Sequence, residues 1–537
     1  MRHRAALLAA LVSSLGLAAA ASAASAAVKP AACTTVFDLP GAKCGTISVP
    51  LDRSGAVPGR VRLFMELDRV RGGGANSTIV VFPGGPGGAT TVEGRGFVHD
   101  LGKARKGHNL LLFDQRGTGR SDYLDCDLAL APSFYAPPGE NAYQIGKGVQ
   151  RCAKQLRARR GLYTTRDTVA DLEDVRKALG IDKFVLYGVS YGTRDAMAYA
   201  QAHPEHVDRV VLDSAVTPAG IDPWAMSSVH AIPRVLTQLC RGGGCKGIAA
   251  DPTADLRTVV ARLEQGPMRA KKPVTLMGCR IRPAITRSRV FGLLQQVDEN
   301  PALLSQLPVA LAEAAKGRPY QLSELEAGQS EYLLFCAFDK LLEQLLGPSK
   351  GLDDDLQLAD RAFSDGDEIA RLCEETPLPW PRDASLSQRQ LLAEGSLAGF
   401  GDDLFAPLDR ATIFASSLVP LCKFWVVANK ELPGGPTELP NVPTLIVSGL
   451  DDLRTPTEDA QALAAATPSA QLLLVPDVGH SVIQSSGCAR RALAHFILGQ
   501  PFAQCHAAPK HVPKPARRVI SLQEQLDAVL KHLPKLP

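Results

Sequence analysis

Residues 183–192 read Lys-Phe-Val-Leu-Tyr-Gly-Val-Ser-Tyr-Gly, a short apolar run that ends in a serine between two glycines. The β-branched and aromatic run predicts a buried strand, and residues 191–202 predict a helix directly after it. A serine on so tight a strand-to-helix turn has a strained backbone that pushes its hydroxyl out of the sheet, and only small residues fit the crowded flanking positions. The sequence therefore predicts a nucleophile at Ser190.

The segments around this turn alternate between strand and helix patterns. Apolar β runs occupy residues 46–50, 61–70, 77–82, 109–113, 207–213, 443–449 and 470–475, and helical patterns occupy 168–179 and 489–498. We expect the first two runs to be antiparallel entry strands. The remaining alternation predicts an α/β fold, with a mostly parallel sheet that helices cover on both faces.

This alternation stops between about residues 217 and 440, where the sequence is helical or irregular. Amphipathic stretches lie at 256–263, 303–315, 330–346 and 387–397. The simplest organisation is one α/β core, formed by residues 27–216 and 441–505, into which a mainly helical lid (217–440) is inserted. The tail (506–537) carries one short amphipathic helix, which we expect to pack on the surface.

The first 26 residues have the pattern of a signal peptide. Arg2 and Arg4 precede an apolar core (5–20), and small residues at 21–23 or 24–26 offer a cleavage site. A membrane anchor is the alternative, but the core is shorter than the ~20 residues that a span needs. We therefore expect an exported, soluble monomer in the periplasm or outside the cell. The formal charge is +4 without a basic stripe, so nucleic acid is not an expected partner.

Twelve cysteines follow the predicted cleavage site. An even number in an oxidising compartment predicts up to six disulfides. Short separations favour the pairs Cys33–Cys44, Cys126–Cys152, Cys240–Cys245 and Cys488–Cys505. The three possible pairings of Cys279, Cys336, Cys373 and Cys422 stay open. A metal site is the alternative, but the cysteines lack CxxC spacing, so we expect neither a metal nor an organic cofactor.

A serine hydroxyl needs a base within hydrogen-bond reach, and that base needs a carboxylate to orient it. After an elbow of this kind the partners follow in the order Asp, then His, on loops behind later strands. His480 follows the run 470–475 in a Gly-His turn. Asp452 follows the run 443–449, and its neighbour Asp451 is the alternative. The predicted catalytic triad is Ser190, Asp452 and His480.

The carbonyl that such a serine attacks develops negative charge, which needs backbone N–H donors. We expect one donor at Tyr191 and the other at Gly85, in the Gly-Gly-Pro-Gly turn after the run 77–82. A phosphate cradle is the alternative for this turn, but no Gly-Lys-Ser/Thr follows it. Residues 114–116 (Asp-Gln-Arg) are expected either to brace the turn or to hold Arg116 in a structural ion pair.

Taken together, these segments resemble the proline iminopeptidase and tripeptidyl aminopeptidase (TAP-like) branch of the α/β-hydrolases. The matching stretches are residues 44–46, 49–52, 83–87, 114–117, 163–165 with 171–172, 188–192, 209–213 and 479–480, together with Cys422, Trp425, Cys488 and Cys505. The resemblance implies an α/β-hydrolase fold and a serine hydrolase that releases N-terminal residues or tripeptides from small peptides through an acyl-enzyme. A carboxylesterase or related small-molecule hydrolase with the same triad is the alternative.

The sequence departs from that branch near the predicted triad. Residues 452–456 read Asp-Leu-Arg-Thr-Pro where the branch usually has Asp-Pro-Val-Thr-Pro, so the neighbouring pocket is expected to differ. Aminopeptidases usually neutralise the substrate ammonium group with acids. Lid candidates for this task are Glu324, Glu326, Glu331 and Asp339, each of which could instead be a solvated charge on a helix face. The number of residues released and any preference for proline stay open.

Overall fold

The computed structural model of this chain describes residues 27–70, 77–126, 142–328, 333, 336–337, 340, 353–429, 432, 439–506 and 518–530. The predicted signal peptide lies outside the described residues. Within them, no helix combines the length and the apolar character that crossing a membrane requires.

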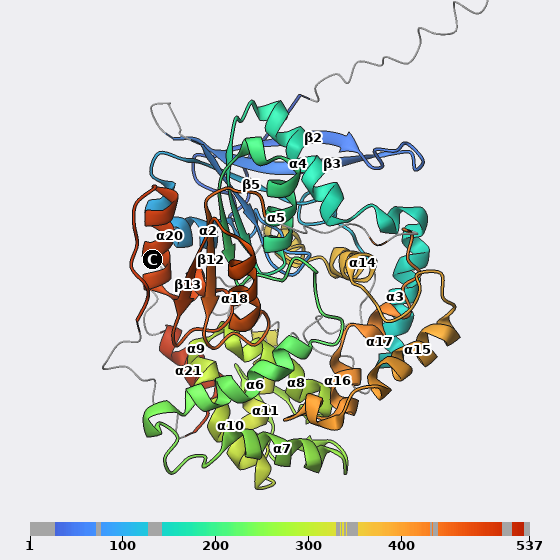
Figure 1. Ribbon diagram of the computed structural model, residues 1–537, viewed down its shortest axis with the longest axis vertical. Coiled ribbons are helices and arrows are strands. Elements are labelled where there is room, and N and C mark those ends of the chain that lie inside the picture. Colours follow the sequence, from blue (N-terminus) through green and yellow to red (C-terminus); the bar gives the residue numbers. More distant parts are fainter. Residues whose placement is uncertain are drawn as a thin grey trace, which may run out of the picture.

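A nine-stranded sheet forms the centre of the described chain (Figure 1). The strands are β1 (Lys29–Ala31), β2 (Lys43–Pro50), β3 (Arg60–Asp68), β4 (Thr78–Phe82), β5 (Asn109–Phe113), β6 (Phe184–Val189), β7 (Val207–Asp213), β12 (Thr444–Gly449) and β13 (Ala470–Val475). Their order across the sheet is β1-β2-β3-β5-β4-β6-β7-β12-β13. Neighbours from β5 to β13 are parallel, whereas β1, β2 and β3 are antiparallel. The predicted mostly parallel sheet with antiparallel entry strands is confirmed.

Helices cover both faces of this sheet because its central strands are apolar on both sides. In β4, Val80 and Phe82 pack on one face, and Ile79 and Val81 pack on the other. The first face is covered by α4 (Thr165–Leu179), α5 (Gly192–Ala202) and α18 (Thr457–Ala466), the second by α2 (Gly94–Leu101) and α20 (Gly487–Ile497). Burying one such Val, Ile or Phe side chain contributes roughly 1.5–3 kcal/mol.

The chain leaves the sheet after β7 and returns at β12, and most of the helices between them lie beyond one end of the sheet (Figure 1). They include α6 (Met226–Leu239), α7 (Pro252–Leu263), α8 (Arg287–Gln296), α9 (Pro301–Leu304), α10 (Leu307–Ala315), α11 (Tyr320–Ala327), α13 (Asp353–Asp360), α14 (Asp365–Glu375), α15 (Leu386–Ala398), α16 (Arg410–Ser416) and α17 (Val419–Cys422). Many of them pack around an apolar core of their own, which includes Trp224, Val235, Leu256 and Phe291.

Two features of the structure differ from the sequence-based expectation. The lid contains two small antiparallel pairs, β8 (Met268–Arg269) with β11 (Ala284–Ile285) and β9 (Val274–Leu276) with β10 (Cys279–Ile281). Strands of two or three residues are too short to show a two-residue period. The structure also contains a helix that is not among the helical patterns identified above, α3 (Ala142–Leu156), which packs against α14 and α17 of the lid (Figure 1).

The structure contains six disulfides and no free cysteine among the described residues. Four of them are the pairs favoured by short separation. The remaining cysteines form Cys279–Cys336 and Cys373–Cys422. The second of these bonds ties α14 to α17 within the lid.

The tail helix α21 (Leu522–Leu530) packs on the lid rather than on the sheet. Val519, which precedes it, is buried in the lid core. The backbone N–H of Met277 donates to the side-chain oxygen of Gln523 at 2.8 Å. Residues at the far end of the chain therefore help to hold the lid together.

Candidate active site

Ser190 occupies a strained position between β6 and α5. Its φ is +54°, in the left-handed region that side chains rarely adopt. A Cβ atom on Gly188 would lie 2.5 Å from the carbonyl oxygen of Gly192, and one on Gly192 would lie 2.2 Å from that of Phe82. Because backbone atoms crowd both flanking positions, neither can carry a side chain. The hydroxyl is consequently held at the carboxyl end of the sheet.

His480 lies in the loop after β13, and Asp452 lies in the loop after β12. Nδ1 of His480 is 3.1 Å and 3.2 Å from the two carboxylate oxygens of Asp452. Both side chains are buried, and Nε2 of His480 has no hydrogen-bond partner among the described residues. No hydrogen bond joins Ser190 to His480 in the described part of the chain. Catalytic hydrogen bonds are often long in unliganded enzymes and shorten when substrate binds.

Several hydrogen bonds keep Asp452 ionised. The backbone N–H groups of Arg454 and Thr455 and the hydroxyl of Thr455 donate to its carboxylate at 2.8–2.9 Å. Burial favours the neutral acid, but His480 and these donors outweigh it and hold the pKa of Asp452 below its ordinary value. Burial likewise opposes protonation of His480, yet the Asp452 carboxylate raises the pKa of that imidazole.

Asp451, the alternative to Asp452, does not hydrogen-bond to His480. Its buried side chain borders a small cavity together with Arg241 and Asp477. Burial raises the pKa of Asp451 to about 7. Two adjacent acids therefore have opposite environments, and only Asp452 has the environment of a carboxylate that orients a base.

The Gly-Gly-Pro-Gly turn lies against the serine. A Cβ atom on Gly84 would be 3.1 Å from Cβ of Ser190, and Gly85 lines the same pocket as Ser190 and Tyr191. Gly85 has a φ of +117°, and Phe363 of the lid packs directly on it. The two expected oxyanion donors therefore border the cavity into which a substrate carbonyl would enter.

Within the segment 114–116, Asp114 and Arg116 contact different parts of the structure. Asp114 is fully buried and accepts hydrogen bonds from the N–H and hydroxyl of Thr91 and from the N–H of Arg120. It thereby fixes the chain just after the glycine turn. Arg116 instead forms a buried two-pronged ion pair with Asp171, at 2.6 Å and 2.7 Å. Asp114 braces the turn, and Arg116 holds α4.

The first turn of α5 rests on α14 of the lid. The Tyr191 hydroxyl donates to Glu375 at 2.6 Å, and Arg194 donates to the same carboxylate at 3.1 Å. One turn earlier, Arg371 makes two 3.0 Å bonds to Asp195. These buried ion pairs join the lid to the helix that begins beside Ser190.

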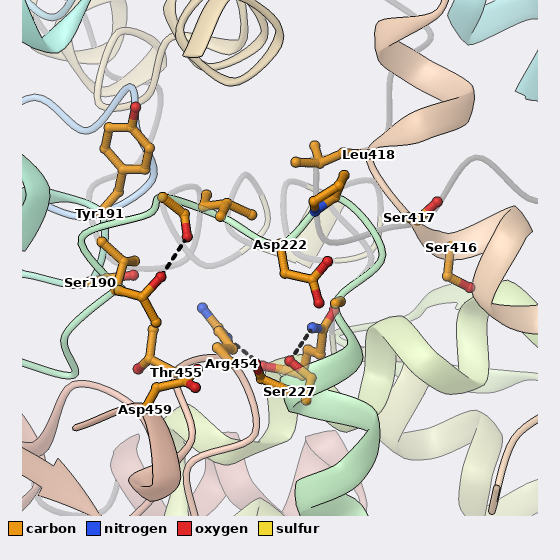
Figure 2. Close-up of a pocket in the computed structure, with 18 of the residues that line it drawn as sticks. Ser190, Tyr191, Asp222, Ser227, Ser416, Ser417, Leu418, Arg454, Thr455 and Asp459 are labelled. Carbon is orange, nitrogen blue, oxygen red and sulfur yellow. Dashed lines mark hydrogen bonds between the residues drawn. The ribbon is translucent and has the colours of Figure 1, made fainter. Parts of the chain in front are cut away.

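A cavity of about 140 Å³ opens beside Ser190 (Figure 2). Core residues on its wall include Gly85, Tyr191, Thr455 and Asp459, and residues of the lid and its approach include Val216, Ile221, Asp222, Ser227, Ser416 and Leu418. Its wall therefore combines apolar side chains, two acids and the cation Arg454, and it is built from segments on both sides of the lid insertion.

The acids on this wall are not the predicted ones. Asp222 accepts hydrogen bonds from the N–H groups of Trp224 and Met226, and burial raises the pKa of Asp459. Both carboxylates line the cavity. No sequence pattern marks either one, since Asp222 lies in an irregular loop and Asp459 is an ordinary acid in the first turn of α18.

The predicted lid acids lie elsewhere or outside the described residues. Glu324 and Glu326 belong to α11, and neither is among the residues that line the cavity. Glu324 accepts a hydrogen bond from Tyr320, and Glu326 pairs with Arg289 at 3.3 Å. Glu331 and Asp339 fall outside the described residues. Among the described residues, the acids that border the cavity are therefore Asp222 and Asp459 and not those of α11.

Two described clusters bring three possible metal-ligating atoms together. The first contains Cys33 and Cys44, whose sulfurs are bonded to each other. The second contains Asp298, Asp452 and His480. In the second, the Arg454 guanidinium lies 3.3 Å from Asp298, so a cation already neutralises that carboxylate. In the first cluster the two sulfur atoms are bonded to each other. In the second cluster the guanidinium of Arg454 balances the negative charge of Asp298.

Comparison with known proteins agrees with this architecture. Residues 77–239 match the family of the α/β-hydrolase fold, and residues 408–501 match the family described as TAP-like protein. A tripeptidyl aminopeptidase of Streptomyces lividans is 31% identical over 234 residues, which are 39% of this chain and 42% of that protein.

Two further relatives have shorter or similar matches. Serine protease Hip1 of Mycobacterium tuberculosis is 30% identical over 234 residues, which are 40% of this chain and 44% of that protein. A proline iminopeptidase of Xylella fastidiosa is 36% identical over 134 residues, which are 25% of this chain and 31% of that protein. In each case the chain spans less than half of the relative's own length. The chain is thus an α/β-hydrolase-fold protein, in which residues 77–239 match the α/β-hydrolase family and residues 408–501 match the TAP-like family.

Proposed function

We propose that this chain is an exported serine hydrolase, an aminopeptidase that releases N-terminal residues or tripeptides from short peptides. The observation that carries the proposal is the pair of acids on the wall of the cavity beside Ser190, which Arg454 also lines. Asp222 and Asp459 line the same cavity as the serine and the oxyanion turn. An ammonium group bound there would place the first residues of a peptide against the nucleophile.

The proposed mechanism follows from the protonation states of the triad. Asp452 is ionised and can only accept hydrogen bonds, so Nδ1 of His480 carries the proton that points to it. Nε2 is then the basic nitrogen, and it takes the proton of Ser190 as the hydroxyl attacks the carbonyl. The backbone N–H groups of Tyr191 and Gly85 stabilise the negative oxygen. His480 then protonates the leaving amine, and water hydrolyses the acyl-enzyme by the reverse route.

In the proposed function, substrate binding depends on the attraction between the ammonium group of the substrate and the acids of the cavity. Burial raises the pKa of Asp459, which means that its carboxylate lacks full compensation in the unliganded cavity. A substrate ammonium restores that compensation, whereas a neutral, blocked N-terminus does not. We therefore expect binding to require a free N-terminus.

A carboxylesterase with the same triad is the second candidate. Val216, Ile221 and Leu418 give the cavity apolar wall that would also accept a short acyl chain. The two candidates differ in whether the acids of the cavity contribute to binding.

Export is proposed on two grounds. Six disulfides require an oxidising compartment to form and persist, and the first 26 residues have the pattern of a signal peptide. The periplasm and the external medium both satisfy this requirement. N-terminal sequencing of the protein recovered from each fraction would identify the cleavage site and the compartment.

The function is tested with chromogenic substrates. Mature protein is incubated with aminoacyl-, prolyl- and tripeptidyl-arylamides, with their N-acetylated forms, and with short acyl esters. We expect the free arylamides to be cleaved and N-acetylation to abolish cleavage. Turnover of esters alone would reject the peptidase and favour the carboxylesterase. The variant Ser190→Ala serves as the control that assigns the turnover to this site.

A further inference from the structure

A second carboxylate, which the lid supplies, lies beside the proposed triad. Asp298 belongs to the 3-10 turn η5 (Val297–Glu299), between α8 and α9, and its side chain is fully buried. One oxygen of Asp298, one oxygen of Asp452 and one ring nitrogen of His480 lie within 4.8 Å of one another. Asp298 takes no direct part in the proposed proton transfers.

Asp298 binds the loop that carries Asp452. The backbone N–H of Leu453 donates to Oδ2 of Asp298 at 2.8 Å, and Nε of Arg454 lies 3.3 Å from Oδ1. These two residues directly follow Asp452 in the chain. The carboxylate therefore fixes the turn from which Asp452 projects, although it comes from a segment 155 residues away.

Asp298 also binds the loop that carries His480. The backbone N–H of His480 donates to the carbonyl oxygen of Asp298 at 3.1 Å. A Cβ atom on Gly479 would lie 2.1 Å from the same oxygen. A residue with a side chain at position 479 would push η5 away, so the contact depends on this glycine.

We propose that Asp298 is a positioning residue that links the lid to both catalytic loops and supports the protonated state of His480. Its backbone and side chain set the spacing at which Asp452 meets the imidazole. Its negative charge adds to that of Asp452 when His480 has taken up the serine proton. The inference rests on the proposed function, since it requires that His480 acts as the base.

The charged groups around the imidazole determine in which direction the pKa of His480 shifts when the charge of Asp298 is removed. Asp452 and Asp298 favour the imidazolium form, and Arg454 opposes it. The buried Asp213, at the end of β7, is close enough for the imidazolium to lower its pKa, although burial raises that pKa to about 6. Burial raises the pKa of Asp298 itself to about 7. Where Asp298 is ionised, its charge favours the imidazolium, so removal of that charge lowers the pKa of His480.

The decisive variant is Asp298→Asn, which keeps the shape of the side chain and an acceptor for Leu453. We expect kcat to fall about 10- to 100-fold, because small displacements of a catalytic group are costly. We expect KM to change less than about twofold, because η5 does not line the cavity. The acid limb of the pH profile of kcat/KM should move to lower pH, by roughly half a pH unit or more.

The matched control is Glu299→Gln. Glu299 is the next residue of the same turn and pairs with the side chain of the same arginine, Arg454, at 2.6 Å, but it is half exposed and makes none of the contacts of Asp298 to Leu453 and to the backbone of His480. We expect Glu299→Gln to leave the acid limb of the pH profile of kcat/KM unchanged. A second variant, Gly479→Ala, separates η5 from the His480 loop without removing a charge. It should lower kcat even where Asp298→Asn fails to fold.

Three outcomes separate the inference from the proposed function. Wild-type kcat and an unmoved acid limb in folded Asp298→Asn would overturn the inference, as would an equal loss in Glu299→Gln. Full activity of Gly479→Ala would also overturn it. Retained turnover by Ser190→Ala, measured in the same series, would instead overturn the proposed function.

Discussion

At the scale of single residues, two adjacent acids, Asp451 and Asp452, have opposite environments, and only Asp452 contacts His480. Asp452 accepts three hydrogen bonds from its own loop and contacts His480, whereas Asp451 faces a different cavity. The sequence places both acids in the same loop behind a buried strand and favours the second. The backbone turn from residue 449 to residue 455 separates their roles.

This difference predicts the outcome of a pair of matched substitutions. Asp452→Asn should lower kcat by about 10⁴-fold, because an amide at this place lets His480 adopt the wrong tautomer. Asp451→Asn should leave kcat within a few-fold of the parent. Steady-state kinetics of the two purified variants measure the difference. Equal losses of kcat in the two variants would contradict the assignment of Asp452 as the acid that orients His480.

A second residue-scale prediction concerns pH. The Asp452 carboxylate raises the pKa of His480 above its ordinary value of about 6.5. The imidazole must be neutral to accept the serine proton, so activity is lost as pH falls through this raised pKa. We expect the acid limb of kcat/KM to have its midpoint above pH 6.5 and to fall about tenfold per pH unit below it. A midpoint near pH 5 would contradict the assignment of His480 as the base.

A third residue-scale prediction concerns the acids of the cavity. Asp459→Asn removes a charge that a substrate ammonium would contact, while it conserves the size of the side chain. We expect KM for free aminoacyl- or tripeptidyl-arylamides to rise about tenfold or more, since charge-assisted hydrogen bonds contribute about 1.5–3 kcal/mol. Hydrolysis of an uncharged acyl ester serves as the control and should change little. An unchanged KM for the arylamides would remove Asp459 from the proposed binding site.

At the scale of secondary-structure elements, α14 connects the lid to the helix that begins beside Ser190. Glu375 binds Tyr191 and Arg194, and Arg371 binds Asp195, all in the interior. Breaking a buried ion pair leaves an uncompensated charge behind. The lid is thus anchored to the core by polar contacts whose partial removal is costly.

We therefore expect Arg371→Ala to lower the free energy of unfolding by about 3–5 kcal/mol. Urea denaturation followed by circular dichroism measures this change. The control is Arg318→Ala, which removes an exposed arginine paired with Glu313 on the lid surface and should leave the midpoint almost unchanged. Similar midpoints for the two variants would show that the α14 contacts do not support the fold.

At the scale of the whole molecule, the sequence predicted the sheet and pointed to the two loops that bring Asp452 and His480 together, but it did not predict the walls of the cavity. Buried parallel strands are continuous apolar runs, and the elbow needs glycines at fixed positions, so β4, β6, β7 and β12 leave a local signal. The places of Asp222, Asp298 and Asp459 beside the cavity and the proposed triad result from contacts between distant segments. Such contacts have no local signature in the sequence.

The covalent links of the molecule lie partly within the lid, and this leads to a prediction for Cys373–Cys422. Replacing both residues by serine should lower the stability by about 2–5 kcal/mol, because the bond closes a long loop between α14 and α17. Thermal unfolding of the double variant measures the loss. An unchanged midpoint would mean that this bond adds little to the packing of the two helices.

The central claim is that Ser190 is the nucleophile, and a covalent label tests it most directly. Mature protein is treated with a fluorophosphonate, and the adduct is located by mass spectrometry of peptides. The account predicts one phosphonylated serine, at position 190, with activity lost in proportion to labelling and no label on Ser190→Ala. An adduct on another residue that accounts for the lost activity, or full activity with Ser190 completely labelled, would contradict it.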